Sequence, residues 1–148
     1  MSAKEGYKFE ELSVGMAHET HHTITEEDIE LFAKVSGDYN PIQLDEEYAK
    51  KTPFGQRIAH GALTASYISG ILGNDLPGPG AIFTHLEMRF RRPVFIGDTL
   101  HATSEVIALR ESKSRPDTGI VTFLHEAVNQ RGEVVCRCER SALLKKAG

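Results

Sequence analysis

One stretch of the chain constrains its fold more than any other. Between Gly61 and Gly73 no residue is charged, and the run reads Gly-Ala-Leu-Thr-Ala-Ser-Tyr-Ile-Ser-Gly-Ile-Leu-Gly. It is shorter than the ~20 apolar residues that a membrane-spanning helix requires. A helix that is apolar on nearly every side has to be surrounded by other parts of a protein. We therefore predict a central helix here, wrapped by other protein.

The second half of the chain supplies strands that can enclose this helix. Alternation over residues 82–90 places one set of side chains on a common face, namely Ile82, Thr84, Leu86, Met88 and Phe90. Longer strands are expected over 99–109, 119–128 and 133–144, and residues 129–132 are typical of a hairpin connection. A long antiparallel sheet wrapped around one apolar helix is an α+β architecture.

The first half is expected to be mainly helical. Residues 18–24 can form a short strand. Thr25 then opens a helix that ends near Gly37, because threonine is a good N-cap and glycine is a common C-terminal stop. Turn-forming residues follow at 38–41, and Asp45 is expected to cap another short helix.

The chain length of 148 residues fits one domain over 1–148, with residues 1–16 as a loosely held lead-in. The net charge is -4 and the basic residues are dispersed, so neither nucleic acid nor a membrane surface is expected as a partner. With no apolar leader at the N-terminus, the cytoplasm is the expected location. Of the two cysteines, we expect one to face the core and the other the opposite surface, without a disulfide between them.

Three sequence blocks point to a family. Residues 36–45 read Ser-Gly-Asp-Tyr-Asn-Pro-Ile-Gln-Leu-Asp, residues 59–61 read Ala-His-Gly, and residues 93–100 read Pro-Val-Phe-Ile-Gly-Asp-Thr-Leu. In this order and spacing they resemble the MaoC-like branch of the hot-dog superfamily, which contains (R)-specific enoyl-CoA hydratases and 3-hydroxyacyl thioester dehydratases. The resemblance covers the chain from about Phe9 to Leu144. It implies a hot-dog fold and reversible hydration of a trans-2-enoyl thioester to the (R)-3-hydroxyacyl thioester.

The resemblance also implies site residues. The family motif Asp-x-Asn-Pro-x-His falls on residues 38–43, so Asp38 takes the place of the catalytic aspartate and Gln43 stands where the catalytic histidine is expected. The backbone N–H of Gly61 is expected to bind the thioester oxygen. Physical chemistry agrees, because a helix N-terminus has unpaired donors and glycine allows close approach.

Gln43 is the main departure from the family pattern. Its amide can replace the hydrogen bond of a histidine, but it cannot exchange a proton near neutral pH. Three explanations stay open. Asp38 alone suffices for the reaction, or the chain is a non-catalytic binding or partner subunit beside an active homologue, or glutamine is an engineered substitution.

Asn40, His60 and Ser69 are further candidates for contact with the substrate. For each there is a plainer interpretation: Asn40 shapes the loop, His60 packs at the helix start, and Ser69 is a small residue for helix–sheet packing. His18 and His22 would share a strand face, but no third ligand stands at metal-site spacing, so we predict no metal site. No cofactor is implied beyond the CoA or acyl carrier protein of the substrate.

The fold alone does not distinguish a hydratase from a partner subunit or from a thioesterase, since all of them use it. A single sheet of this kind leaves its edges exposed, which proteins seldom tolerate. We therefore expect a homodimer or a dimer of dimers, with a heteromer as an alternative. The sequence does not indicate the acyl chain length.

Overall fold

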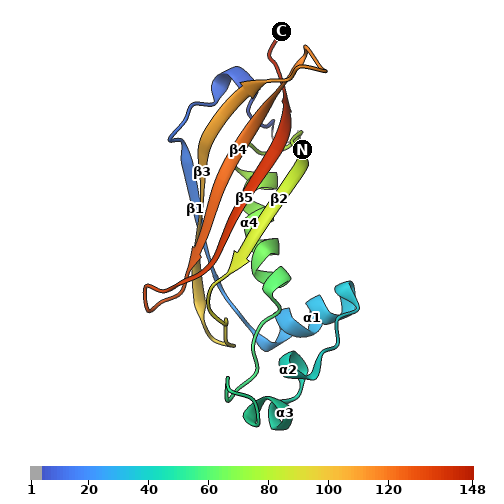
Figure 1. Ribbon diagram of the computed structural model, residues 1–148, viewed down its shortest axis with the longest axis vertical. Coiled ribbons are helices and arrows are strands. Elements are labelled where there is room, and N and C mark those ends of the chain that lie inside the picture. Colours follow the sequence, from blue (N-terminus) through green and yellow to red (C-terminus); the bar gives the residue numbers. More distant parts are fainter. Residues whose placement is uncertain (1–4) are drawn as a thin grey trace.

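The computed structural model describes residues 5–148, with the side chain of Leu72 excepted. Along the chain the elements are η1 (Phe9–Glu11), β1 (Ala17–Thr23), α1 (Glu26–Ser36), α2 (Pro41–Leu44), α3 (Glu46–Lys50), α4 (Gly61–Asn74), β2 (Ile82–Phe90), β3 (Thr99–Glu111), β4 (Thr118–Val128) and β5 (Val134–Lys145). The five strands form one antiparallel sheet in the order β1-β3-β4-β5-β2. This sheet curves around α4, while α1, α2 and α3 gather near the N-terminal end of that helix (Figure 1). The predicted α+β architecture is confirmed, and it is the arrangement that the hot-dog resemblance implies.

Helix α4 packs on the sheet through one side only. Leu63, Ile68 and Ile71 are buried against sheet residues such as Leu100 and Val135. Each such side chain contributes about 1.5–3 kcal/mol by leaving water. The opposite side of the helix stays open, and its exposed residues include Ala62, Ser66 and Gly73. The predicted wrapping of the sheet around this helix is confirmed, and the sheet of a single chain covers one side of it.

The predicted helix ends are confirmed. Thr25 Oγ1 accepts a hydrogen bond from the Asp28 N–H at 3.1 Å, and Asp28 Oδ2 accepts one from the Thr25 N–H at 2.9 Å. Gly37 ends α1 in the left-handed conformation with a φ of 76°. Asp45 Oδ1 caps α3 by accepting from the Tyr48 N–H.

The alternation predicted for residues 82–90 is interrupted by a β-bulge between Phe83 and His85. Phe83 lies opposite the buried Ala142, whereas Ile82 lies opposite Leu143 on the other face. Since a bulge inserts one unpaired residue, the expected common face changes within the strand. Leu86, Met88 and Phe90 remain on the α4 side.

The prediction that the two cysteines face opposite sides is also wrong. Residues two apart in a strand share a face. Both Cys136 and Cys138 are accordingly buried on the α4 side of β5, and both are free thiols. Burial raises the pKa of the Cys136 thiol to about 11, which keeps it protonated and unreactive at neutral pH.

From residue 5 onward, the N-terminal segment packs against one end of the sheet; residues 1–4 of the expected lead-in lie outside the described residues. Leu12 is buried, Phe9 lies against Gly119, and the Tyr7 N–H donates to the Pro77 carbonyl at 2.8 Å. Among the described residues, no helix has the length and apolar character needed to cross a membrane.

Candidate active site

The loop after α1 is shaped by its own polar side chains. Ser36 Oγ accepts from the Asp38 N–H at 3.1 Å, Asp38 Oδ1 accepts from the Asn40 N–H at 3.2 Å, and Asn40 Oδ1 accepts from the Ile42 N–H at 3.1 Å. Pro41 then occupies the first turn of α2, where its missing N–H is tolerated. Asp38 is left exposed, and its second carboxylate oxygen has no partner among the residues that the structure describes. Asn40 is occupied as a helix cap, as its plainer interpretation predicts.

His60 connects this loop to the start of α4. Its Nε2 lies 3.0 Å from the backbone carbonyl oxygen of Asp38. Because a carbonyl oxygen only accepts, Nε2 must carry the hydrogen. The imidazole is 3% exposed, and the Phe32 ring packs against it at a centroid distance of 5.0 Å. His60 directly precedes Gly61, so this contact holds the Asp38 backbone close to the start of α4.

Gly61 is the first residue of α4 and lines a cavity of about 400 Å³. The N–H groups of a first helical turn have no acceptor within the helix, so they are available to a ligand. A Cβ at this position would lie 2.6 Å from Cε1 of Phe90, and Phe90 lines the same cavity. Other lining residues include Phe54, Ala59, Pro93 and Val94, so the space beside the amide is largely apolar.

Gln43 is buried and its backbone is firmly held. Its carbonyl oxygen accepts from Arg57 Nε at 2.7 Å, and Arg57 Nη1 forms an ion pair with Glu26 Oε1 at 2.6 Å. Among the described residues Oε1 of Gln43 has no hydrogen-bond partner, and no hydrogen bond joins its side chain to Asp38. The amide oxygen is therefore buried without a hydrogen-bond partner among the described residues.

Arg57 was not predicted from the sequence. It is 7% exposed and links α1 to α2, two elements whose proximity only the folded chain reveals. An isolated arginine between two helices gives no local signal of such a contact.

Ser69 lies two turns beyond Gly61 on α4, and its Oγ accepts from Arg140 Nη1 at 2.7 Å. Both residues line a second cavity of about 400 Å³, with Ala65, Phe83 and Leu86 among its other walls. The structure therefore places Ser69 on the same helix as Gly61 and in the wall of a cavity.

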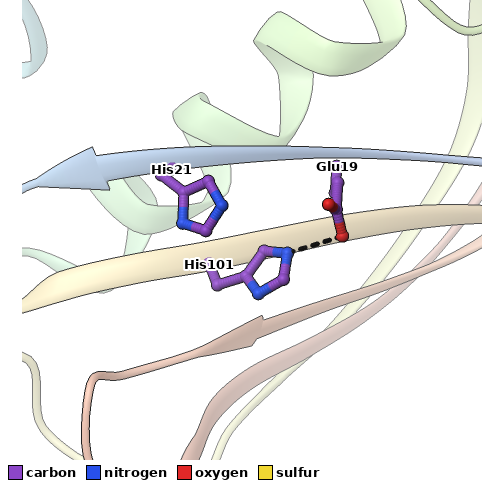
Figure 2. A group of neighbouring side chains, drawn as sticks. All are labelled: Glu19, His21 and His101. Carbon is purple, nitrogen blue, oxygen red and sulfur yellow. Dashed lines mark hydrogen bonds and ion pairs between the residues drawn. The ribbon is translucent and has the colours of Figure 1, made fainter.

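A group of possible metal ligands lies elsewhere, on the outer face of β1 and β3. Figure 2 shows Glu19, His21 and His101, whose ligand atoms all lie within 4.8 Å of one another. His101 Nε2 is 2.8 Å from Glu19 Oε2, and the two imidazole rings stack at 4.3 Å, so an ion pair and ring stacking account for the arrangement. The Glu-x-His spacing was the sequence signal for this group, and it was missed.

The two histidines that the sequence singled out do not join that group. His22 Nε2 lies 2.9 Å from Asp28 Oδ2, and His18 Nε2 lies 3.4 Å from Asp75 Oδ2. They share the opposite face of β1.

Comparison with known proteins places these features in a family. The model of the MaoC like domain matches residues 10–129. An (R)-specific enoyl-CoA hydratase of Rhodospirillum rubrum is 41% identical over 95% of this chain and 93% of that protein, and a 3-hydroxybutyryl-CoA dehydratase of Methylorubrum extorquens is 40% identical over 87% and 82%. The solved structure of R-hydratase PhaJ1 of Pseudomonas aeruginosa superposes with a TM-score of 0.85 at 38% identity, covering 95% of this chain and 87% of that one.

Proposed function

Since the chain belongs to the MaoC-like domain family, we propose that it is a hydro-lyase that reversibly hydrates a trans-2-enoyl thioester of CoA or acyl carrier protein to the (R)-3-hydroxyacyl thioester. The relatives named above, a hydratase and a dehydratase, support both directions of this one reaction.

The contact between His60 and the Asp38 carbonyl carries the proposal. It brings a carboxylate loop to the N-terminus of α4, beside the Gly61 amide and its apolar cavity. Hydration needs these two groups together: one to activate water and one to stabilise negative charge on the thioester oxygen. Neither group is sufficient alone.

In the proposed reaction, the Asp38 carboxylate takes a proton from a water molecule while the oxygen of that water bonds to the β-carbon of the enoyl thioester. Electrons move from the double bond to the thioester oxygen, where the Gly61 N–H and the positive end of α4 stabilise the enolate. The carboxyl group of Asp38 then returns a proton to the α-carbon. Gln43 orients the water through its unpaired amide oxygen, without exchanging a proton.

The test is to incubate the protein with crotonyl-CoA and follow loss of the conjugated double bond and release of free thiol in parallel. Hydration without thiol release supports the proposal. Thiol release instead identifies a thioesterase, and binding without either reaction identifies a partner subunit. Asp38→Asn should lower the hydration rate about 10²–10⁴-fold, whereas Asp117→Asn, in the exposed loop before β4, should leave it unchanged.

We further propose that the protein forms a homodimer through β2. This edge strand exposes Phe83, Leu86 and Phe90 beside the open side of α4, and it exposes Ile82 on the other face of the sheet. A second copy would cover the apolar surface and the unpaired strand edge together. Leu86→Lys should produce a monomer in sedimentation experiments, whereas Val14→Lys, at an exposed valine outside β2, should stay dimeric; a wild-type monomer contradicts the proposal.

A further inference from the structure

Arg140 is a buried cation on the face of β5 that packs against α4. It is 4% exposed, and its guanidinium lies 4.8 Å from the centroid of the Phe83 ring. Nη1 donates to Ser69 Oγ, but Nε is buried without a partner. No acidic side chain in the described part of the chain forms an ion pair with it. Buried charges in proteins are normally paired, so this guanidinium lacks a counter-ion.

The described neighbours of Arg140 do not supply a negative charge. His125 is fully buried nearby, with Nδ1 bonded to Ser104 Oγ at 2.7 Å and Nε2 without a partner. Burial and the charge of Arg140 lower the pKa of His125 to about 3, so the imidazole stays neutral at physiological pH. Together, these residues form a polar region with no negatively charged group.

Arg140 also faces a space that a ligand can occupy. It lines the second cavity described above, whose walls also include Ser69, Ala65 and Leu86. Gly61, Ala65 and Ser69 follow one another at four-residue intervals, so they lie on one face of α4. Gly61 and Ser69 are separated by about 12 Å along the helix axis. The cavity at Gly61 and the cavity at Arg140 therefore lie along the same helix, at a spacing that a medium-length acyl group would span.

We propose that Arg140 binds a carboxylate at the far end of the acyl chain, so that the preferred substrate is a 2-enoyl thioester of a medium-chain dicarboxylic acid. This inference rests on the proposed hydratase function and specifies its substrate class. The planar guanidinium fits a carboxylate through two parallel hydrogen bonds, which a simple apolar acyl pocket would not provide.

The decisive comparison uses 2-octenedioyl-CoA and 2-octenoyl-CoA, which differ only in the terminal carboxylate. The wild-type protein should favour the dicarboxylic substrate in kcat/KM by about tenfold to a hundredfold, the range expected for hydrogen bonds to a charged group. Arg140→Met should abolish this preference while retaining the apolar stem, and Arg140→Lys should keep part of it. Arg137→Met is the matched control on the exposed face of the same strand and should preserve the preference. An equal substrate ratio in the wild type and Arg140→Met overturns the proposal.

Two further measurements separate the alternatives. If the protein hydrates neither substrate, the hydratase proposal fails, and calorimetric binding of the saturated octanedioyl-CoA and octanoyl-CoA then decides the role of Arg140. Tighter binding of the dicarboxylic thioester that disappears in Arg140→Met supports it, and equal binding refutes it. The melting temperature of Arg140→Met should be unchanged or higher, because a buried unpaired charge is replaced by an apolar group. A lower value with an unchanged substrate ratio would instead assign Arg140 to an ion pair across a subunit interface.

Discussion

Replacing Gln43 by histidine tests whether proton exchange is what this site lacks. Gln43 is 8% exposed and its backbone is held by Arg57, so the new imidazole should occupy the same place. A positioned acid or base accelerates a reaction about 10²–10⁴-fold. At about 1.4 kcal/mol per tenfold change, this corresponds to lowering the barrier by about 2.8–5.6 kcal/mol. We expect a gain within this range for hydration of crotonyl-CoA.

The same substitution should leave stability nearly unchanged. Gln43 already has a buried amide oxygen without a protein partner, which costs about 1–3 kcal/mol, and an imidazole at this place carries a similar unpaired nitrogen. Urea unfolding should therefore give similar free energies for the two proteins. Their pH profiles should differ, because the rate of the histidine variant should decline as the imidazole is protonated near its ordinary pKa of about 6.5.

The assay is the initial rate of absorbance loss from crotonyl-CoA, measured from acid to neutral pH. Gln56→His, at an exposed glutamine of the loop that precedes α4, controls for the addition of a histidine and should match the wild-type rate. If Gln43→His folds normally yet hydrates no faster than the wild type, proton exchange at position 43 does not limit the reaction, and the role given to this residue is refuted.

Three other changes have defined outcomes. Arg57→Met leaves the Gln43 carbonyl without its buried donor, so it should lower the free energy of unfolding in urea by about 1–3 kcal/mol. A drop in kcat at unchanged KM would show that Arg57 also positions Gln43. Unchanged stability and an unchanged rate would contradict the role of this contact. Gly61→Ala should lower the hydration rate, because its Cβ would lie 2.6 Å from Cε1 of Phe90 and would displace that ring beside the cavity. A fully active variant would argue against binding of the thioester at this place. Burial lowers the pKa of His125 to about 3 in the folded chain, whereas in the unfolded chain the imidazole has its ordinary pKa of about 6.5. Between these two pH values the unfolded chain binds one more proton than the folded chain. The contribution of His125 to the free energy of unfolding should thus be constant above about pH 6.5 and decline toward pH 3. The decline should be shallower in His125→Leu. Identical pH slopes for the two proteins would show that His125 does not contribute to the pH dependence of stability.

Features that depend on neighbouring residues were predictable. The cap at Thr25, the stop at Gly37 and the cap at Asp45 each involve a residue type whose local hydrogen bond or backbone preference decides the outcome. The helix α4 was equally predictable from its uninterrupted apolar run. The link between Asp38 and Gly61 required the family resemblance, because no periodicity predicts that an imidazole will join two segments so far apart in the chain.

Features that depend on tertiary contacts were not predictable in the same way. The bulge after Phe83 changes the face of β2 without a glycine or proline to mark it. Arg57 becomes a positioning residue only when α1 and α2 meet. The open side of α4 arises because five strands surround one side of a helix whose sequence is apolar all round, which leaves the other side for the proposed second copy to cover.

The alternation of β5 shows that the assignment of its residues to the two faces of the sheet decides how Arg140 is interpreted. Residues 136, 138, 140 and 142 share a face because a strand repeats every two residues, and all four are buried. Placing the two cysteines on opposite faces obscures this pattern. Placing them together puts Arg140 among core residues, where a guanidinium needs a counter-charge. Among the described residues no acid pairs with Arg140, and this missing counter-charge is the basis of the proposal that a carboxylate at the far end of the acyl chain binds there.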